Sequence, residues 1–522
     1  MNARIRQVIV IFSTMMATFL VVLDMTIANV ALDHMRGTLS AGVDEITWVL
    51  TSFLVANAIV LPLTGWLMDL LGRKRLFIGA TIAFTLTSAM AGAAPSLMVM
   101  VLARFLQGLA GGPLAPLSQS TMMETFPARQ RGMAMAIWGI GMMFAPIIGP
   151  TLGGWITDNW SWRWVFYINV PVGIAAVFLA WLFLPESSTE RPAVRRVDVP
   201  GLALLVLGVS AMQFVLDRGQ REDWFSSSLI TWLSTIAVVA LVALVIRELY
   251  TDEPVVDLRV LRHPVFAVGT AAMFTISIAF YGIMVLSPLF TQILMGYTAM
   301  LAGLVLAPGG LATLVTMPIA GALLNRTDPR WMIAIGCALN ALAMSLMATL
   351  TLEASYWNIM LPRFIQGLGI GLTFVPLSTV ALSAVPIREM GHASGLFNFI
   401  RTMGGSIGIA TVSTLLQRGA QTHQARLVGH ISLYDPDVWD RHQTLTALFA
   451  ARGADPATAE QQAWAHLYAM VQRQALSLSF IDNFWLLTWI FLAVILFVLF
   501  LGRRPGMTAK PEAGRHATVA EA

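Results

Sequence analysis

Charged residues are scarce in this chain. Asp, Glu, Lys and Arg make up 11% of its 522 residues, far below the roughly 25% that is usual in soluble domains. Hydrophobic residues make up 57%. Apolar stretches of about 20 residues, long enough to cross the roughly 30 Å hydrocarbon layer of a bilayer, recur along nearly the whole length. The shortage of charge excludes a soluble globular protein and predicts an all-α polytopic membrane protein, surrounded by membrane lipid.

Cysteine, lysine and clustered histidine are scarce as well. Cys337 is the single cysteine, so no disulfide can form within the chain. The only lysines, Lys74 and Lys510, are followed by Arg75 and Pro511, whereas the phosphate-binding loop of an ATP-driven pump needs Ser or Thr after its lysine. None of the eight histidines is expected deep inside an apolar stretch, and no set of metal ligands is found. The chain is therefore predicted to be neither an ATPase nor a membrane-embedded enzyme, and to hold no metal.

The hydropathy pattern predicts 14 transmembrane helices. No separate secretory signal precedes the first of them, so residues 1–30 are interpreted as a retained helix. Because the number of helices is even, both termini lie on the same side of the membrane. The predicted spans are 8–31, 47–69, 77–96, 98–123, 132–156, 164–184, 199–216, 228–247, 265–290, 300–324, 331–351, 357–384, 393–416 and 480–502.

Basic residues gather on the side of the termini. Loops rich in Lys and Arg stay in the cytoplasm, so both termini are predicted to be cytoplasmic. The net charge of +4 therefore does not indicate a nucleic-acid partner. The clusters on the terminal side are Arg73-Lys74-Arg75, Arg129 and Arg131, Arg191, Arg195 and Arg196, Arg326 and Arg330, and Arg503-Arg504, while the short opposite loops hold Arg36, Arg163, Arg218 and Arg221.

Segments of the first half recur in the same order in the second half. Arg104-Phe-Leu-Gln107-Gly108 is matched by Arg363-Phe-Ile-Gln366-Gly367, and Leu61-Pro62-Leu63-Thr64-Gly65 by Met317-Pro318-Ile319-Ala320-Gly321. Matched segments in matched order are typical of a membrane transporter built from two related halves.

The repeat predicts two six-helix bundles with an insertion between them. The N-terminal bundle covers residues 1–184 and the C-terminal bundle residues 265–502. A linker at 185–264 adds two central helices that have no counterpart in the repeat. Residues 503–522 are expected to form a cytoplasmic tail.

A long polar segment precedes the last predicted helix. Residues 418–479 are expected to form an extracytoplasmic loop, and loops of this length often have a function. Asp455 and Pro456 provide a helix cap and a first-turn proline, so an amphipathic helix is expected over residues 458–477. The alternative is a cap without a function.

Three arginines lie well inside the predicted helices, away from their ends: Arg104, Arg363 and Arg401. An arginine at membrane depth costs several kcal/mol unless it is paired or hydrated, so each marks a cavity or a functional pair. Asp24 is the only carboxylate well inside a predicted span, about 24 Å above the cytoplasmic end, and Arg104 lies at a similar height on a helix of opposite direction. We therefore expect Asp24 and Arg104 to face each other or a shared water path.

An acid beside a fixed cation can lose and regain a proton, which is what proton coupling requires. We expect Asp24 and Arg104 to serve this role. The alternative is a static buried ion pair that only specifies packing.

The second predicted helix ends in Gly65-Trp-Leu-Met-Asp69-Leu-Leu-Gly72-Arg73-Lys74-Arg75, and a degenerate copy spans Gly321 to Arg330. The glycine permits close helix contact, and the acid and the basic cluster lie at the cytoplasmic rim, where they can pair across a moving interface. This pattern resembles the loop motif of the major facilitator superfamily. The resemblance implies the fold of that superfamily and a cytoplasmic latch, formed by Asp69, Gly72 and Arg73, that stabilises one access state.

Ala145-Pro146-Ile-Ile-Gly149-Pro150-Thr-Leu-Gly153-Gly154 lies in the middle of a predicted helix. The prolines kink the helix and the glycines form a smooth face for a neighbour. The segment resembles the antiporter motif of the superfamily, which occurs in drug/proton exchangers rather than sugar symporters, although Ala136 and Ala145 replace two usual glycines. The alternative is a kinked packing helix. The residues to which the resemblance assigns a conformational role are Pro146, Gly149, Pro150, Gly153 and Gly154.

The first helix carries Leu23-Asp24-Met-Thr26-Ile-Ala-Asn29, which resembles the first-helix motif of the 14-helix drug/proton antiporters, although Asp33 stands where a proline is usual. With Thr47-Trp48, the repeated arginine motif and the extra helix pair, the resemblance covers nearly the whole chain. The long segment before the last helix and the stretch Asp217 to Phe225 narrow it to the EmrB-like branch.

Membership of the EmrB-like branch implies a multi-pass pump of the bacterial inner membrane. Such a pump exports hydrophobic, often weakly acidic drugs or toxicants, and it is driven by the proton gradient without a cofactor. The resemblance also implies a tripartite efflux system with an EmrA-like periplasmic adaptor and an outer-membrane channel. The alternative is a proton-driven exporter of an endogenous metabolite such as a siderophore.

Polar and aromatic residues on several predicted helices are candidates to line a central substrate cavity. Methionine and phenylalanine side chains accommodate varied apolar ligands by repacking. Arg401 is the strongest candidate, because the cost of burying it demands a partner and an anionic ligand group would provide one. The substrate-binding candidates are Asn29, Asn57, Gln107, Tyr281, Gln292, Phe374, Phe397, Asn398 and Arg401.

Overall fold

The computed structural model describes residues 3–184, 198–431 and 434–500. Within these ranges the side chains of residues 3–6, 43, 44, 147, 150, 299, 499 and 500 are not described. The predicted tail at 503–522 and the linker up to residue 197 lie outside the described residues. The same holds for the basic residues Arg191, Arg195, Arg196, Arg503 and Arg504.

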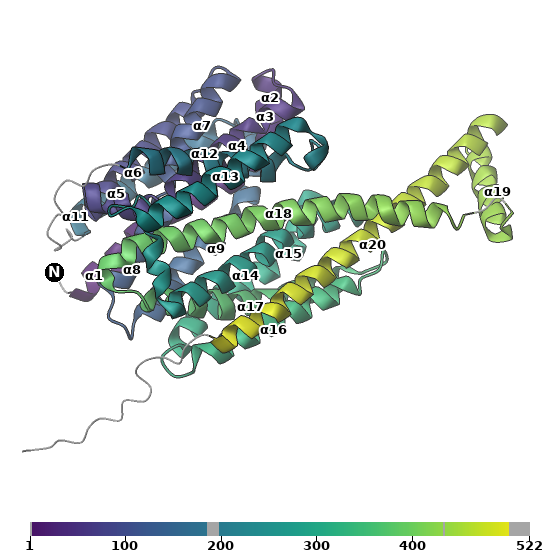
Figure 1. Ribbon diagram of the computed structural model, residues 1–522. Coiled ribbons are helices and arrows are strands. Elements are labelled where there is room, and N and C mark those ends of the chain that lie inside the picture. Colours follow the sequence, from purple (N-terminus) through teal and green to yellow (C-terminus); the bar gives the residue numbers. More distant parts are fainter. Residues whose placement is uncertain (1–2, 185–197, 432–433, 501–522) are drawn as a thin grey trace, which may run out of the picture.

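The described chain folds into a bundle of long helices (Figure 1). It contains 12 helices long and apolar enough to cross a membrane, or up to 14 spans when two bent pairs are each counted as one. This agrees with the all-helical fold and the 14 spans predicted from the sequence. In chain order the helices are α1 (Ala3–Val30), α2 (Leu32–Thr38), α3 (Val43–Ile46), α4 (Trp48–Val60), α5 (Thr64–Leu71), α6 (Arg73–Gly92), α7 (Leu97–Gly111), α8 (Leu114–Thr125), α9 (Arg131–Asn159), α10 (Trp164–Tyr167), α11 (Asn169–Phe183), α12 (Val199–Arg218), α13 (Ser228–Tyr250), α14 (Pro264–Leu289), α15 (Ala299–Leu323), α16 (Pro329–Ala348), α17 (Tyr356–Ser383), α18 (Met390–Val428), α19 (Pro436–Ala451) and α20 (Pro456–Phe500).

Asp-Pro pairs start several of these helices. Before α16 and α19, a side-chain oxygen of Asp328 or Asp435 accepts a hydrogen bond from a backbone N–H of the first turn, at 3.0 Å. Asp455 does the same before α20, and its hydrogen bonds with Thr458 hold the pKa of its carboxyl below the usual value. The proline that follows each aspartate needs no hydrogen-bond acceptor at the first helical position.

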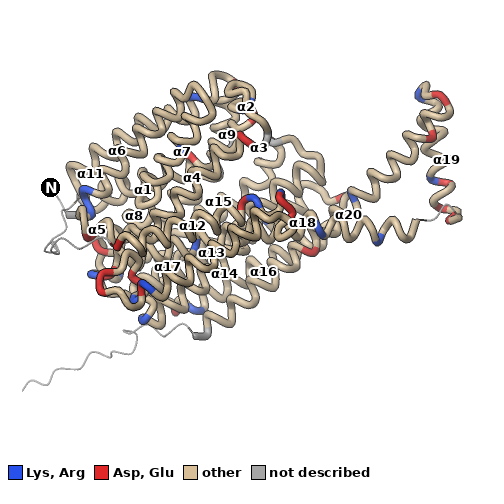
Figure 2. Tube along the Cα trace, turned by 45° about the horizontal axis from the view of Figure 1, so that its top comes forward, with Lys and Arg blue, Asp and Glu red and all other residues tan. Residues whose placement is uncertain are grey.

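The helices pack in two groups. Helices α1 to α11 pack mainly against one another, and α14 to α18 pack together with α20. Contacts between the groups join α9 to α15 and α17, and α18 to α5 and α8. Charged residues lie mostly at the two ends of the bundle and on the part that projects from it, and the middle is nearly free of them (Figure 2). This distribution suits a protein whose middle faces hydrocarbon.

The repeated Arg-Phe-X-Gln-Gly motif has the same packing role in both groups. A Cβ added at Gly108 of α7 would overlap the carbonyl oxygen of Phe53 on α4, and one added at Gly367 of α17 would overlap that of Gly309 on α15. Because glycine has no side chain, each pair of helices crosses with the backbones nearly in contact.

The extra helices α12 and α13 form a hairpin, and α12 packs against α4 and α18 (Figure 1). At its open end Asp198 caps α12 through Gly201 and accepts hydrogen bonds from Arg247 of α13 at 2.7 and 2.9 Å. The hydrogen bonds from Arg247 lower the pKa of the Asp198 carboxyl. At the closed end Asp217 accepts from Thr51 on α4 at 2.5 Å.

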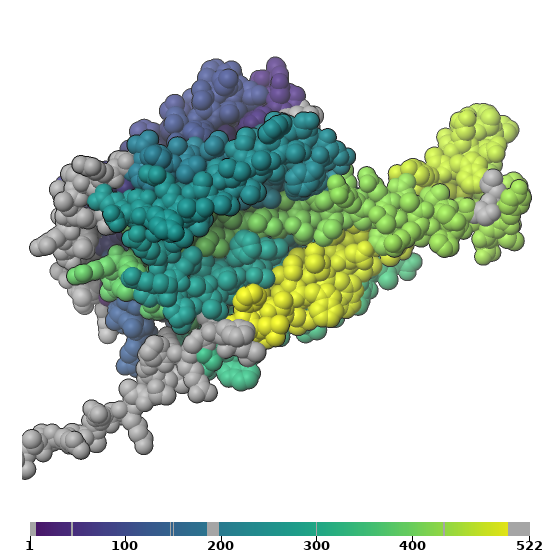
Figure 3. Space-filling model, viewed as in Figure 1, coloured from purple at the N-terminus to yellow at the C-terminus, as the bar shows by residue number. Residues whose placement is uncertain are grey.

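Residues 418–479 were expected to form a long loop with one amphipathic helix, and most of the described residues in this segment are helical. Helix α18 has 39 residues and α20 has 45, whereas about 20 suffice to cross the hydrocarbon layer. Both run on past the rest of the bundle, and α19 packs against the far part of α20 (Figures 1 and 3). The expected helix at 458–477 does begin at Pro456, but it continues into the last span because no glycine or proline interrupts residues 457–500.

We call this extension, residues 418–479, the projecting hairpin. His423 contacts Asp482 at 2.6 Å and Gln424 donates to the Tyr468 hydroxyl at 2.8 Å, so its two long helices are joined by polar contacts. Near its tip the His442 ring stacks against Trp464, with ring centroids 4.2 Å apart.

Candidate functional site

Asp24 and Arg104 form an ion pair inside the first group of helices, as their predicted heights indicated. Both side chains are 0% exposed. Asp24 lies on α1 and Arg104 on α7, and Nη1 of Arg104 donates to Oδ2 of Asp24. Gln107, one turn after Arg104, accepts from Nη1 at 2.8 Å and donates to the other oxygen of Asp24 at 3.0 Å. The Arg-Phe-X-Gln spacing therefore lets the guanidinium of Arg104 and the amide of Gln107 both donate to the carboxylate of Asp24.

Two further residues of this cluster were not predicted from the sequence. Asn169 of α11 donates to Oδ1 of Asp24 at 2.9 Å and to the Ser88 hydroxyl at 3.0 Å. Ser88 in turn donates to the backbone oxygen of Phe166 at 2.9 Å. A polar Asn at the start of an otherwise apolar helix was the available signal. Nothing in the sequence says, however, that this helix packs beside α1.

The guanidinium of Arg104 is held from several sides. Its Nε donates to the backbone oxygen of Val49 at 3.1 Å, and its carbon lies 4.3 Å from the centre of the Phe53 ring. Nη2 is buried and has no hydrogen-bond partner. Arg104 is thus fixed on α4 and α7, while Asp24 lies on a different helix, so a change in the charge of Asp24 acts directly on the contact between helices.

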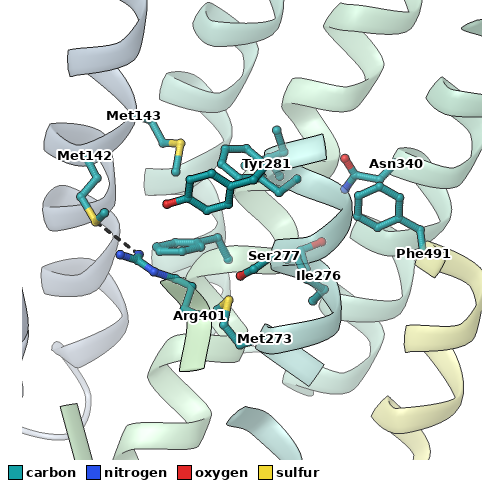
Figure 4. Close-up of a pocket in the computed structure, with 13 residues that line it drawn as sticks. Met142, Met143, Met273, Ile276, Ser277, Tyr281, Asn340, Arg401 and Phe491 are labelled. Atoms are coloured by element: carbon teal, nitrogen blue, oxygen red, sulfur yellow. Dashed lines mark hydrogen bonds between the residues drawn. The ribbon is translucent and has the colours of Figure 1, made fainter. Parts of the chain in front are cut away.

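A cavity lies between the two groups of helices (Figure 4). Arg401 of α18 enters it with 7% exposure, and its Nη1 donates to the sulfur of Met142 on α9 at 3.6 Å. Nε of Arg401 is buried without a hydrogen-bond partner, and none of the described carboxylates pairs with it. The lining residues are Met142, Met143, Met273, Ile276, Ser277, Phe280, Tyr281, Asn340, Ile370, Thr373, Phe374, Arg401 and Phe491. The cavity is therefore apolar and aromatic around one unpaired cation.

Three of the predicted substrate residues, Tyr281, Phe374 and Arg401, line this cavity. The other candidates lie elsewhere. Asn29 and Gln292 are exposed, Asn57 is half-buried on α4, and Gln107 belongs to the Asp24 cluster. Phe397 is fully buried, and Asn398 donates to Gln119 of α8 at 2.6 Å, which joins the two groups of helices. Helix periodicity explains the difference, because polar residues on one helix face in different directions.

The lining methionines were not predicted individually. Met142 and Met143 come from α9 and Met273 from α14. The chain has 29 methionines, and nothing in the sequence distinguishes these three from the ones in the core. Their flexible thioether side chains can adapt to ligands of different shape.

Two glycines of the antiporter-like segment, Gly149 and Gly153, face α1. A Cβ added at Gly149 would overlap the side chain of Thr26, and one added at Gly153 would lie 3.2 Å from Ile27. A Cβ at Gly154 would meet nothing within 4 Å. Helix α9 bends by 42° between its parts 131–146 and 151–159. Pro146 ends the first part, and Pro150 lies in the bend with its side chain outside the described set. Helix α9 therefore contacts α1 just after Asp24 and also lines the cavity.

The loop motif that begins at Gly65 contacts the other group of helices. Oδ2 of Asp69 lies 3.0 Å from Nε2 of His392 on α18, and a Cβ added at Gly65 would overlap that histidine. Gly72 has a φ of +80°, which glycine adopts without strain. Arg73 forms an ion pair with Glu124 of α8, within its own group. Among the described residues, Asp69 therefore contacts the other group of helices, whereas the ion pair of Arg73 stays within its own group.

The degenerate copy of that motif makes a matching contact. Asn325 donates to the backbone oxygen of Arg129 at 2.7 Å. Gly132 of α9 and Gly321 of α15 bring the two backbones close together. The contact of His392 was not predicted, because His392 comes just before the predicted span 393–416. It is 8% exposed and lies in the first turn of α18.

Two groups of helices around a shared cavity, with an ion pair buried in one of them, define a membrane transporter of two halves. The family model described as Major Facilitator Superfamily matches residues 14–409. This chain belongs to the major facilitator superfamily and, within it, to the EmrB-like transporters. As a transporter of this family it is not an enzyme, in agreement with the prediction.

Full-length relatives define the branch. The chain is 38% identical over 500 residues to the multidrug export protein EmrB of Escherichia coli K12, covering 94% of this chain and 95% of that protein. It is 39% identical over 488 residues to EmrB of Haemophilus influenzae, covering 93% and 94%. It is also 38% identical over 435 residues to the fatty acid resistance protein FarB of Neisseria gonorrhoeae, covering 83% and 85%.

Solved structures show the same fold. The proton:xylose symporter XylE superposes with a TM-score of 0.61 at 15% identity, covering 96% of this chain and 97% of that chain. The human organic anion transporter TETRAN superposes with a TM-score of 0.55 at 14% identity, covering 93% and 99%. At such identities the likeness concerns the fold alone.

Proposed function

We propose that this chain exports lipophilic compounds that carry an anionic group across the bacterial inner membrane, in exchange for protons. The ion pair between Asp24 and Arg104, both 0% exposed, carries the proposal. A carboxylate sealed between helices can take up and release one proton per cycle, and its charge decides whether its contact with a fixed cation is attractive. Relatives named for multidrug export and fatty acid resistance support the substrate class.

The coupling uses the residues around Asp24. Protonation removes its negative charge, so Arg104 keeps only neutral partners, the oxygens of Gln107 and Val49. Helix α1 is then free to shift against α7. The glycine contact of α9 with Thr26 transmits this shift to the cavity. Loss of the proton to the cytoplasm restores the ion pair and returns the two groups of helices, moving as units, to their first arrangement.

Arg401 selects the substrate in this scheme. It is the charged residue that lines the cavity, and its Nε has no hydrogen-bond partner. A carboxylate or sulfonate would pair with its guanidinium fork. The apolar part of the ligand would lie against Phe374, Tyr281 and the methionines.

The test uses purified protein in vesicles with an imposed pH gradient, and decanesulfonate as an anion that stays charged. Collapse of the gradient with nigericin is expected to lower decanesulfonate transport to the level of empty vesicles. In a second arm, Arg401→Gln is expected to slow decanesulfonate transport by about tenfold or more, because hydrogen bonds to charged groups contribute roughly 1.5–3 kcal/mol and about 1.4 kcal/mol is a factor of ten. Transport of the neutral dye Nile red should stay within about twofold, because no charge pairing is lost.

Arg36→Gln, at an arginine in the last turn of the short helix α2, is the matched control and should transport both compounds normally. Equal decanesulfonate transport with and without the pH gradient would show that transport is not coupled to protons. If Arg401→Gln slows the transport of decanesulfonate and of Nile red equally, Arg401 does not select for an anionic group.

The projecting hairpin suits a partner outside the membrane. We propose that both termini are cytoplasmic, which puts the hairpin in the periplasm, since Figure 1 shows α1 beginning and α19 lying at opposite ends. Tyr434 is 96% exposed and Trp439 46% exposed near its tip, and exposed aromatic residues are enriched at protein interfaces. We propose that a periplasmic adaptor binds here and connects the pump to an outer-membrane channel.

Removal of the hairpin tip, residues 430–455, with a short Gly-Ser connection between α18 and α20, is expected to leave vesicle transport within about twofold, because the cavity and Asp24 are far from it. Resistance of whole cells to lipophilic anions should fall to that of cells without the protein, because the adaptor contact is lost. Both properties are measured on the same variant. Full resistance of the deletion strain would exclude an adaptor site at the tip.

A further inference from the structure

The second group of helices contains a copy of the buried cluster in which the acid is missing. Nη1 of Arg363 on α17 donates to Oε1 of Gln366, just as Arg104 does to Gln107. In place of a carboxylate, Nη1 meets the Ser287 hydroxyl of α14 at 3.0 Å. The repeat therefore preserves the cation and the amide, and a neutral side chain stands where Asp24 stands in the first group.

Arg363 consequently has unused hydrogen-bonding capacity. Its Nε is buried without a partner, and among the described residues no carboxylate pairs with it. A guanidinium at membrane depth with only neutral partners costs several kcal/mol. Such a cost indicates that an anion binds there during the transport cycle.

The position of Arg363 relative to the cavity identifies that anion. On α17, Arg363 precedes Ile370 by seven residues, which is about two turns and about 10.5 Å on the same face of the helix. On α14, Ser287 follows Phe280 by the same interval. Ile370 and Phe280 both line the cavity. Arg363 and Ser287 thus lie directly beyond the cavity on the faces of α14 and α17 that line it, toward the end of the bundle where α17 begins.

We propose that Arg363 and Ser287 form a second anion-binding subsite, which receives the acidic head group of a substrate after it leaves Arg401. This inference rests on the proposed export of lipophilic anions. The cluster around Asp24 gives the geometry, because there the same Arg and Gln hold a carboxylate. The Ser287 hydroxyl, which accepts from Arg363, can still donate its own proton to an oxygen of the anion. The two arginines then act in sequence along one path.

The test compares binding at Arg401 with export past Arg363. Purified Arg363→Gln is expected to bind decanesulfonate with an affinity within about twofold of the original protein, while export of decanesulfonate from vesicles falls by about tenfold or more. Export of neutral Nile red should stay within about twofold, since it does not use a cation. Arg363→Lys should recover part of the decanesulfonate export, because the charge remains but the fork does not.

Ser287→Asp provides a second variant that adds a partner instead of removing one. It rebuilds in the second group the acid–arginine pair of the first. The new carboxylate should occupy Arg363, so decanesulfonate export should fall as far as in Arg363→Gln while the protein remains folded. Thr275→Ala is the control on the same helix and should export normally, because the Thr275 hydroxyl donates to the backbone oxygen of Ala271 at 3.1 Å and does not line the cavity.

Each remaining outcome contradicts either the second subsite or the proposed export of lipophilic anions on which it rests. Unchanged decanesulfonate export in Arg363→Gln or Ser287→Asp overturns the subsite, as does an equal loss of Nile red export or of decanesulfonate binding. If replacing chloride by sulfate abolishes export by the original protein but has no effect on Arg363→Gln, an inorganic ion occupies the site and the proposal is wrong. Failure of the original protein to export decanesulfonate at all would instead contradict the proposed function.

Discussion

Asp24→Asn is expected to abolish transport driven by a pH gradient while leaving substrate binding intact. Asparagine has nearly the same shape and can still accept from Arg104, but it takes up no proton, so the contact between α1 and α7 no longer changes during the cycle. Decanesulfonate transport in vesicles should fall to the level measured with nigericin. Binding to purified protein should stay within about twofold, because Asp24 does not line the cavity.

Loss of the carboxylate also leaves the cation of Arg104 buried without its counter-ion, and breaking a buried ion pair costs roughly 3–5 kcal/mol. Thermal unfolding separates this effect from coupling. The double variant Asp24→Asn with Arg104→Gln should regain much of the lost thermal stability, since no buried charge remains, and should still fail to respond to the gradient. Asp33→Asn is the matched control, because Asp33 is exposed. Gradient-driven transport by Asp24→Asn would show that the pair is only structural.

Gly149→Ala is expected to disrupt the contact that joins the proton site to the cavity. The added methyl group would overlap the side chain of Thr26, two residues after Asp24, so α1 and α9 must separate. Overpacking of this kind typically costs about 1–3 kcal/mol. Transport should fall by about tenfold or more, with a lowered midpoint of thermal unfolding, because a loosened contact no longer transmits movement from Asp24 to Met142.

Gly154→Ala is the matched control for this prediction. It makes the same chemical change on the same helix with the same gain in helix propensity, about 1 kcal/mol, yet its methyl group would meet nothing within 4 Å. It should transport normally and be at least as stable as the original protein. Equal transport by the Gly149 and Gly154 variants would show that the glycine face has no part in coupling.

The candidate site was predictable where a single residue places a charge inside the membrane, because burying a charge in hydrocarbon costs free energy. Asp24, Arg104 and Arg401 stand out because a charge in an apolar helix must have a partner or a ligand. The pairing of Asp24 with Arg104 followed from counting residues along two helices of opposite direction. Asn169 does not stand out in this way, because a neutral amide in a helix is compatible with many surroundings. Its contact with Asp24 depends on the packing of α11 beside α1.

The cavity was predictable only in part, for a related reason. Tyr281 and Phe374 were proposed from residue type and do line it, whereas Asn29 and Gln292 were proposed on the same ground and are exposed. The residue type does not say toward which neighbour a helix face is turned. Gly149 and Gly154 illustrate the same point, because both belong to one motif and only Gly149 contacts α1.

Composition and periodicity by themselves determined that the chain crosses the membrane about 14 times, that its halves are related, and which charges lie at membrane depth. These properties depend on the cost of placing polar groups in hydrocarbon, which each segment meets on its own. Tertiary structure alone decided that Asn169 joins the Asp24 cluster, that Ser287 replaces the acid beside Arg363, and that α18 and α20 continue as helices into the segment 418–479. Those features depend on how helices rotate and pack against one another, and that is settled by the fit of many side chains at once.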